Sequence, residues 1–239
     1  MRLAMLAALG LVAASRAGAG ETALVLSGGG AKGAYEVGAL QRLCEDPAHA
    51  NSWSILTGTS IGAMNAGALA QWSQKEQCKG VNSSLLNYWK SIKTLDNVMI
   101  AGKMSVTHKT ESCFSATGSI NMYQNLMGHG GLCDPSPGRS AYRQLVSQER
   151  IRSSGMKLSV VSSSLLTAEP VWFDETDADI VQGCIASGAI APLVWPVHAR
   201  KQWFVDGGIF HNTPILEALK RGASNVLVIC LDADQHVPL

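Results

Sequence analysis

A serine held between two glycines is the residue of this sequence best suited to act as a nucleophile. An apolar run from Ile55 leads into Gly58-Thr59-Ser60-Ile61-Gly62, and an alanine-rich segment follows. The G-x-S-x-G pattern is typical of a nucleophile elbow, a sharp turn that exposes the serine hydroxyl between a strand and a helix, whose N-terminus would favour negative charge at Ser60. Gly58 and Gly62 suit this turn because a Cβ atom at either position would crowd it. An ordinary strand-to-helix turn has the same appearance, so other residues must support the assignment.

A glycine-rich loop precedes this turn and is suited to holding an anion. The loop GGGAKG follows an apolar run, and its residues are Gly28, Gly29, Gly30, Ala31, Lys32 and Gly33. Loops of this kind present backbone N–H groups to anions. If Ser60 attacks an ester, the N–H groups of Gly29 and Gly30 would stabilise the oxyanion. Lys32 is expected to hold the loop, to add positive potential, or simply to face solvent.

Two nucleotide-binding interpretations of the same loop find little support. A dinucleotide fold would need an acidic residue about twenty positions after the glycines, at the end of a second strand. Glu45 and Asp46 come too early for that role, and Asn51 and Ser52 are neutral. A Walker-type phosphate loop would need Lys-Ser or Lys-Thr after its last glycine, which Gly33 lacks. We therefore expect no nucleotide as ligand.

An aspartate after another apolar run is the candidate general base. Residues 202–205 are predicted to form a strand that stops at Asp206-Gly207-Gly208, so the carboxylate would lie at a strand end, where open parallel sheets carry their chemistry. A triad of Ser60, Asp206 and His236 would have the chain order of an α/β-hydrolase, but His236 lies in a tail expected to fray. His211 is close to Asp206 in sequence and is a weak third partner. The simpler interpretation is a Ser60–Asp206 dyad in which the carboxylate accepts the hydroxyl proton.

The elements that would position these residues alternate between strands and helices. Hydrophobic spacing predicts strands at 22–27, 53–57, 156–162, 171–173, 202–205 and 225–231. Helices are predicted at 34–44, 63–69, 85–92, 141–150, 179–188 and after Pro214. This order favours an α/β fold with a mainly parallel central sheet. Residues 96–137 lack a regular pattern, and the segment 94–138 is expected to be either a lid or a surface excursion pinned by disulfides.

Length and composition favour one domain of an exported protein. The chain has 239 residues, 46% hydrophobic and 15% charged, with a net charge of +1, so it has no electrostatic footprint for nucleic acid. Residues 1–20 resemble a secretory signal peptide, with an uncleaved N-terminal anchor as the alternative, and 21–239 form the predicted domain.

The cysteines fit export as well. Their even number, six, makes disulfides the expectation in an exported chain, and six cysteines allow fifteen full pairings. Cys113 and Cys133 flank one loop-like region, whereas Cys230 lies in an apolar run and is expected to be a buried small hydrophobe. No C-x-x-C or Cys/His cluster indicates a metal site.

Taken together, four blocks of the sequence resemble the ordered motifs of patatin-like phospholipases between Thr22 and Asp232. The blocks are GGGAKG at 28–33, GTSIG at 58–62, ASGAIAP at 186–192 and DGG at 206–208. The resemblance implies a patatin-like three-layer fold, Ser60 as nucleophile, Asp206 as base, and an oxyanion hole formed by Gly28, Gly29, Gly30, Lys32 and Gly33. It also implies hydrolysis of acyl esters of lipids at a membrane or micelle surface, with no cofactor and no metal in the chemical step. The glycine of Asp206-Gly207-Gly208 stands where many members have alanine, and residues 96–137 contain no motif of the family.

Three other functions remain as alternatives at this level. A carboxylesterase or thioesterase of the same fold would act on soluble acyl esters, a lipid-binding or storage protein would keep the fold with little turnover, and a nucleotide-binding domain would use only the glycine loop. The apolar side chains of Leu193, Val194, Trp195 and Trp203 are expected in the core, with an acyl pocket or a lipid-facing rim as the alternative.

Overall fold

A computed structural model describes residues 4–6, 11–14, 20–103, 110–115 and 119–232 of the protein. Most of the predicted signal peptide and the whole tail that contains His236 lie outside these ranges. Within residues 1–20, the short strands β1 (Ala4–Leu6) and β2 (Leu11–Ala14) extend one edge of the central sheet. The assignment of these residues as a signal peptide stays a prediction.

A central sheet organises the domain. Among the described residues, nine strands join it, and those not yet given are β3 (Thr22–Leu26), β4 (Trp53–Thr59), β7 (Lys157–Ser164), β8 (Pro170–Asp174), β9 (Val197–Ala199), β10 (Gln202–Asp206) and β11 (Asn225–Ile229). Their order is β1–β2–β11–β3–β4–β7–β10–β9, with β8 also paired to β7. The four central strands β11, β3, β4 and β7 run parallel, and the flanking pairs are antiparallel. The predicted α/β class with a parallel central sheet is confirmed.

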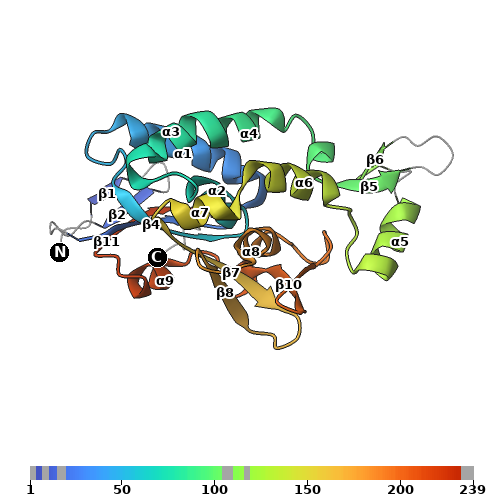
Figure 1. Ribbon diagram of the computed structural model, residues 1–239. Coiled ribbons are helices and arrows are strands. Elements are labelled where there is room, and N and C mark those ends of the chain that lie inside the picture. The colour runs from blue at the N-terminus through green and yellow to red at the C-terminus, as the bar shows by residue number, and fades with distance from the viewer. Residues whose placement is uncertain (1–3, 7–10, 15–19, 104–109, 116–118, 233–239) are drawn as a thin grey trace, which may run out of the picture.

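Helices cover this sheet unequally on its two faces (Figure 1). The larger group comprises α1 (Gly33–Glu45), α2 (Ile61–Leu69), α3 (Gln77–Gly80), α4 (Leu86–Ser91), α6 (Ser136–Leu145), α7 (Gln148–Ser153) and α8 (Ile180–Ser187). The short helix α9 (Ile215–Lys220) packs against the opposite face. Side chains alternate across β3 accordingly: Leu24 and Leu26 join the main core, whereas Ala23 and Val25 pack with Ala218 of α9.

The central helix α2 is made of small residues because it is enclosed by other elements. Ala63, Ala66 and Leu69 are fully buried. A Cβ atom on Gly67 would lie 2.5 Å from the Tyr142 hydroxyl and 2.7 Å from the sulfur of Cys184 on α8. The small side chains thus let α2 pack closely against its neighbours and fix the turn from which it starts.

Two predicted helices differ from those observed. The helix predicted at 85–92 begins earlier, because α3, a π-helical segment Val81–Leu85 and α4 follow one another without a break. The single helix predicted at 141–150 is wrong, because the chain breaks into α6 and α7. Val146 and Ser147 are extended there, and Ser147 caps α7 by accepting a hydrogen bond from the Arg150 amide. The apolar spacing continued across this break, and only the capping serine marked it.

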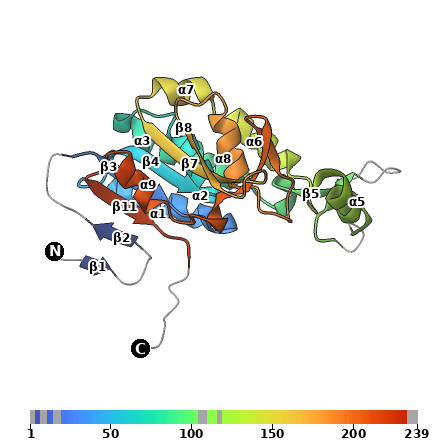
Figure 2. The same ribbon diagram turned by 90° about the horizontal axis from the view of Figure 1, so that it is seen from below.

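The segment 94–138 contains regular structure that its composition did not indicate. The hairpin β5 (Ile100–Lys103) and β6 (Thr110–Ser112) and the helix α5 (Ser119–His129) project from one end of the molecule (Figures 1 and 2). A disulfide between Cys113 and Cys133 closes this segment. The assignment of the segment as a lid or as a surface excursion stays a prediction.

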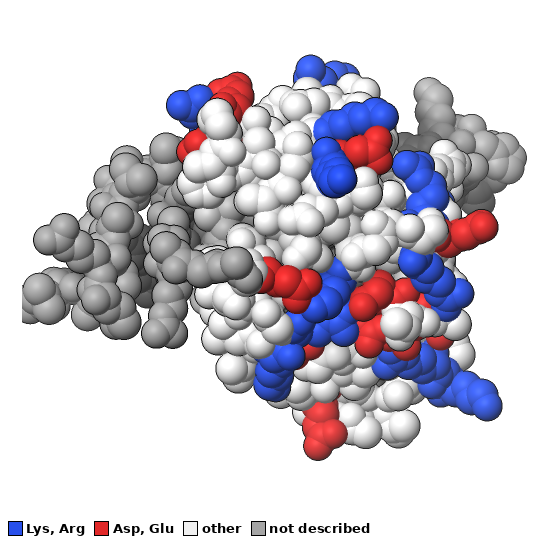
Figure 3. Space-filling model, turned by 60° about the vertical axis from the view of Figure 1, so that its left-hand side comes forward, with Lys and Arg blue, Asp and Glu red and all other residues white. Residues whose placement is uncertain are grey.

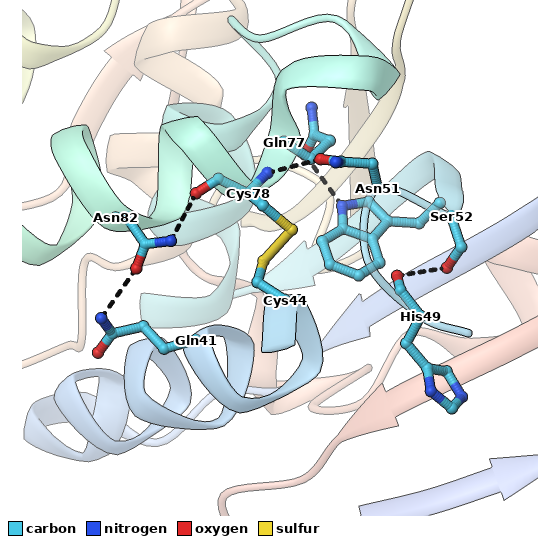
Figure 4. Close-up of a disulfide and its surroundings, with 9 residues drawn as sticks. Gln41, Cys44, His49, Asn51, Ser52, Gln77, Cys78 and Asn82 are labelled. Carbon is cyan, nitrogen blue, oxygen red and sulfur yellow. Dashed lines mark hydrogen bonds between the residues drawn. A yellow bond between two sulfur atoms is a disulfide. The ribbon is translucent and has the colours of Figure 1, made fainter. Parts of the chain in front are cut away.

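A second disulfide ties the end of α1 to α3. Cys44 and Cys78 are bonded, and the Cys78 amide donates to the Asn51 side chain over 2.8 Å (Figure 4). Of the remaining cysteines, Cys184 is free and buried. Cys230 is free and packs against the smaller hydrophobic cluster, but it is partly rather than fully buried and so less enclosed than expected. Four of the six cysteines therefore crosslink the domain.

Charged side chains of both signs are interspersed on the surface. On the face shown in Figure 3, basic and acidic groups lie beside one another. Two ion pairs illustrate the mixing, Lys157 with Glu21 at 2.5 Å and Arg221 with Glu175. In the part of the chain that the structure describes, no helix has the length and apolar character needed to cross a bilayer.

Candidate active site

Ser60 lies at the junction between β4 and α2 in a strained backbone conformation. Its φ and ψ angles are 54° and −123°, which a residue with a Cβ atom rarely adopts. The glycines on either side permit this turn: a Cβ atom on Gly58 would lie 2.5 Å from the Gly62 carbonyl oxygen, and one on Gly62 would lie 2.3 Å from the Leu26 carbonyl oxygen. The local geometry is that of a nucleophile elbow.

Strands β4 and β10 meet end to end along one edge of β7, and this arrangement brings Asp206 to Ser60. Thr59, the last residue of β4, pairs with Val161, and Asp206, the last residue of β10, pairs with the next residue, Ser162. Strand β8 pairs with the same two residues, Val161 and Ser162, from the opposite edge of β7. Asp206 lies at a strand end as expected, but β10 runs antiparallel to β7 and so approaches the site from the direction opposite to β4.

The side chains of Ser60 and Asp206 form a short, buried hydrogen bond. The Ser60 hydroxyl donates to Oδ2 of Asp206 over 2.6 Å, and the two residues are only 6% and 8% exposed. Oδ1 of Asp206 accepts the Gly208 amide over 2.7 Å. Burial raises the pKa of Asp206, against the lowering effect of these two hydrogen bonds. A carboxylate made more basic in this way is a better proton acceptor for the hydroxyl it contacts.

Ser187 holds the turn in place, a role that sequence reasoning did not assign. Its hydroxyl accepts the Ser60 amide over 2.8 Å and donates to the Val161 carbonyl over 2.5 Å. Because Ser187 ends α8, this helix and β7 are both fastened to the elbow. The position of Ser187 inside the conspicuous ASGAIAP block was the one indication of it in the sequence.

The glycine loop passes beside the nucleophile, but only part of it is free to bind an anion. A Cβ atom on Gly28 would lie 3.2 Å from Cβ of Ser60. The amides of Gly28 and Lys32 already donate to the carbonyls of Asn212 and Gly29, and that of Gly33 donates within its own 3-10 turn.

The amides of Gly29 and Gly30, by contrast, have no hydrogen-bond partner among the described residues. Gly30, with φ of +58°, lines the same cavity as Ser60. The predicted set of oxyanion donors therefore narrows to Gly29 and Gly30.

Lys32 and His211 both make hydrogen bonds near the site, Lys32 through its side chain and His211 through its backbone carbonyl. The Lys32 ammonium donates to the Leu231 carbonyl over 2.8 Å, so of the three expected roles it holds the loop. The imidazole of His211 lies against the Trp172 ring, with centroids 5.7 Å apart, and its carbonyl accepts the Thr59 hydroxyl over 2.6 Å. The structure therefore gives His211 no place in a triad, and His236 lies outside the described residues.

Gly207 and Gly208 follow the aspartate in a tight turn. A Cβ atom on Gly207 would lie 2.2 Å from the Val161 carbonyl oxygen. One on Gly208 would lie 3.0 Å from Oδ1 of Asp206. Small residues at these positions allow the turn to direct an amide at the carboxylate.

A mainly apolar cavity of about 370 Å³ opens beside Ser60. Its walls come from α2, α4, α8 and the two ends of the segment 94–138, and they include Met64, Trp89, Ile92, Leu95, Val98, Met99, Ile185, Ile190 and Val194. Val194 therefore contributes to this pocket, whereas Trp195 and Trp203 line a different cavity. Trp203 is 53% exposed, so its expected place in the core is wrong.

The described residues contain no group of three or more His, Cys, Asp or Glu side chains arranged to hold a metal ion. Of the candidate groups for chemistry, Ser60 and Gly30 line the cavity, and Asp206 lies behind Ser60, which donates a hydrogen bond to it.

Comparisons with known proteins agree with this geometry at the level of the family. A family model described as patatin-like phospholipase matches residues 24–219. Two solved structures are also similar: VipD from Legionella pneumophila, at 18% identity and a TM-score of 0.43, and ExoU from Pseudomonas aeruginosa in its complex with SpcU, at 20% and 0.37. The matches cover 86% and 74% of this chain but 50% and 37% of those proteins, so the chain spans half of their length or less.

Proposed function

This chain belongs to the patatin-like phospholipase family, and we propose that it is a serine lipid acyl hydrolase of the phospholipase A or lipase type. The observation that carries the proposal is the 2.6 Å hydrogen bond from Ser60, which lines an apolar cavity, to Asp206. A nucleophile, a base and an acyl-sized pocket at one place are what ester hydrolysis in a lipid requires.

In the proposed reaction, Asp206 takes the proton of the Ser60 hydroxyl as its oxygen attacks the ester carbonyl carbon. The tetrahedral intermediate collapses, the C–O bond to the alcohol breaks, and the alcohol leaves with the proton from Asp206. Water then attacks the acyl-enzyme, again giving a proton to Asp206, and the fatty acid is released as that proton returns to Ser60. The raised pKa of Asp206 suits both transfers, because the carboxyl must accept and return a proton in each half-reaction.

The oxyanion would be held by the amides of Gly29 and Gly30. Their lack of a partner among the described residues and the position of Gly30 on the cavity wall support this role. Each such donor typically lowers the barrier by about 2.7 to 4 kcal/mol. The N-terminus of α2, which begins directly after Ser60, adds partial positive charge on the same side.

Export and action at a lipid surface are further parts of the proposal. Two disulfides support an oxidising compartment, as does the resemblance of residues 1–20 to a signal peptide. The apolar cavity would draw a single acyl chain out of a membrane or micelle. We propose no cofactor, nucleotide or nucleic acid as a partner.

Fatty-acid release from mixed phospholipid and neutral-lipid micelles tests the function. Wild-type protein should release fatty acid, and a folded Ser60→Ala variant should not. A short-chain soluble ester in parallel separates the alternatives: turnover of the soluble ester alone would indicate a carboxylesterase or thioesterase. Lipid binding without turnover of either substrate would indicate a binding protein.

A further inference from the structure

A second cavity, of about 440 Å³, lies next to the proposed active-site cavity and has a different character. Its lining includes Arg139 and Arg143 of α6, Gln182 of α8, the aromatic pair His129 and Trp195, and His198. Arg139 also lines the cavity that contains Ser60, so the two cavities share this residue. The dyad itself does not use this second cavity.

The two arginines of this cavity form no ion pair with a described carboxylate. They are four residues apart on α6 and therefore lie on the same face of the helix, where like charges repel. Among the described residues, no carboxylate lies within 4.0 Å of either guanidinium. The Arg139 guanidinium donates to the Trp195 carbonyl, and Arg143 donates to Gln182 over 3.2 Å.

The environment of Arg139 disfavours its charge. Burial, together with repulsion from Arg143, lowers the pKa of Arg139 to about 10, and the more distant Asp134 opposes this only in part. An anion bound between the two guanidinium groups would offset both effects. Arginine forks bond two oxygens of a phosphate at once, which makes phosphate the anion best matched to this pair.

An aromatic pair forms part of the cavity wall. The rings of His129 and Trp195 are stacked with centroids 4.0 Å apart. The indole N–H of Trp195 is buried and has no partner among the described residues. A ligand that supplies negative charge and acceptor oxygens would match the two arginines beside this pair.

We propose that this cavity binds a phosphate group, carried by a lipid head group or free in solution. The lipid carrier rests on the proposed function, whereas the phosphate chemistry rests on the cavity alone. Helix α5, which ends at His129 in the cavity lining, exposes Ile120, Tyr123 and Met127 by 65 to 71%. Apolar side chains beside a phosphate-binding cavity favour a lipid as the carrier, because head group and hydrocarbon meet at the surface of a bilayer.

Binding is best measured on Ser60→Ala protein, so that hydrolysis does not change the ligand. The probes are inorganic phosphate, glycerol 3-phosphate, and phosphatidylcholine vesicles with or without 30 mol% phosphatidic acid. The variants are Arg143→Gln, Arg139→Gln with Arg143→Gln, and Arg139→Lys, which keeps the charge but loses the fork. Arg152→Gln is the matched control, because Arg152 is also an exposed arginine with one hydrogen bond, to the Thr176 carbonyl, but lies on α7 outside the cavity lining.

We expect the double variant to bind the phosphate probe at least about tenfold more weakly, equivalent to about 1.4 kcal/mol, and Arg152→Gln to bind it like the parent. Loss confined to phosphatidic acid vesicles would identify a lipid head group, and loss with inorganic phosphate as well would identify the phosphate group itself. Two results would overturn the proposal: equal binding by the double variant and the control, or no binding of any phosphate probe by the parent. Circular dichroism and melting temperature check that each variant is folded, and Arg143→Gln, at an exposed position, gives a second reading if the double variant does not fold.

Hydrolysis of a neutral lipid in micelles by the wild-type chain is measured separately. If that hydrolysis fails while phosphate binding depends on the arginines, the proposed function is wrong and the phosphate site stands. If hydrolysis depends on Ser60 while the arginine variants bind normally, the function stands and the phosphate site is wrong.

Discussion

Two buried carboxyl groups, Asp206 and Glu36, differ in the hydrogen bonds that they accept. Burial raises the pKa of both, and that of Glu36 reaches about 8. Both oxygens of Asp206 accept hydrogen bonds, and one of them faces the Ser60 hydroxyl. Glu36 is fully buried, and its Oε1 atom has no partner among the described residues. The comparison shows that complete burial with a single donor leaves the pKa of a carboxyl group far above its usual value, whereas two donors offset part of the effect of burial.

Glu36 acts on the architecture of the site rather than on its chemistry. Oε2 accepts the side-chain amide of Asn65 on α2 over 2.6 Å, and the Asn65 carbonyl oxygen accepts the indole N–H of Trp89 over 3.0 Å. Trp89 forms part of the wall of the cavity beside Ser60. The neutral acid thus joins α1 to α2 and, through Asn65, to the acyl pocket.

Replacement of Asp206 should give the largest loss of activity, without a loss of stability. We expect Asp206→Asn and Ser60→Ala each to lower kcat/KM for a soluble ester by at least about 10⁴-fold. In Asp206→Asn the amide oxygen can still accept from Gly208, so the free energy of unfolding should not fall. In the wild type, activity should be lost as the pH falls and Asp206 becomes protonated, with a midpoint above the usual aspartate pKa. Initial rates against pH and urea unfolding of the variant check these points, and substantial activity in Asp206→Asn would exclude the dyad.

Replacement of Glu36 should change the pH dependence of stability and leave the activity nearly unchanged. Below pH 4.5 Glu36 is protonated in both states; as the pH rises toward 8 the unfolded chain loses this proton first, so folding becomes less favourable. The loss should be on the order of a few kcal/mol, since each unit of pKa difference corresponds to about 1.4 kcal/mol. Glu36→Gln, which keeps an acceptor for Asn65, should remove this pH dependence while keeping kcat/KM within about threefold. Chemical denaturation at pH 5, 7 and 9 measures the difference, and parallel curves for the two proteins would contradict a raised pKa.

Replacement of Ser187 tests whether the turn at Ser60 depends on the two hydrogen bonds made by the Ser187 hydroxyl. Ser187→Ala leaves the Ser60 amide and the Val161 carbonyl without their buried partner, which should cost about 1 to 3 kcal/mol of stability. Because the turn is strained, we also expect kcat to fall by about tenfold while KM changes little. Ser187→Thr, which retains the hydroxyl, is the control. A variant with wild-type kcat would show that the backbone holds the turn unaided.

His211 should produce the smallest effect. Its imidazole packs on Trp172 and its contact with the site is made by the backbone, so His211→Gln should change kcat/KM by about twofold or less. Rate measurements between pH 5 and 8 on both proteins are sufficient. A large loss of activity in folded protein would restore a histidine to the mechanism.

The sequence predicted the central sheet, and it predicted Ser60 and Asp206 as the residues of the proposed dyad, because short-range patterns mark these features. Apolar runs that end in glycine turns placed Ser60 and Asp206 at strand ends, and each run is long enough to identify its strand. The direction of β10 was not predictable in this way, because a strand of five residues carries no mark of which neighbour it joins. Strand direction depends on the long-range pairing with β7.

The remaining differences have similar causes. Glutamate is rarely fully buried, and only the three-dimensional packing shows that Glu36 of α1 is enclosed. The structure in the segment 94–138 depends on contacts such as the Cys113–Cys133 disulfide and the bonds between Ile100 and Asp134. Interactions between residues distant in sequence leave little trace in composition or periodicity.

Because β4 and β10 meet along β7, the site can form only after both strands have been synthesised and have paired with β7. Ser60 is made early, but its base lies 146 residues later, and Asn212 and Leu231 fasten the glycine loop from still further along. During synthesis from the N-terminus, a growing chain therefore contains Ser60 without its partner Asp206 until its last strands emerge and pair. The topology of the sheet delays the assembly of the proposed dyad and its glycine loop until nearly all of the described domain has been synthesised.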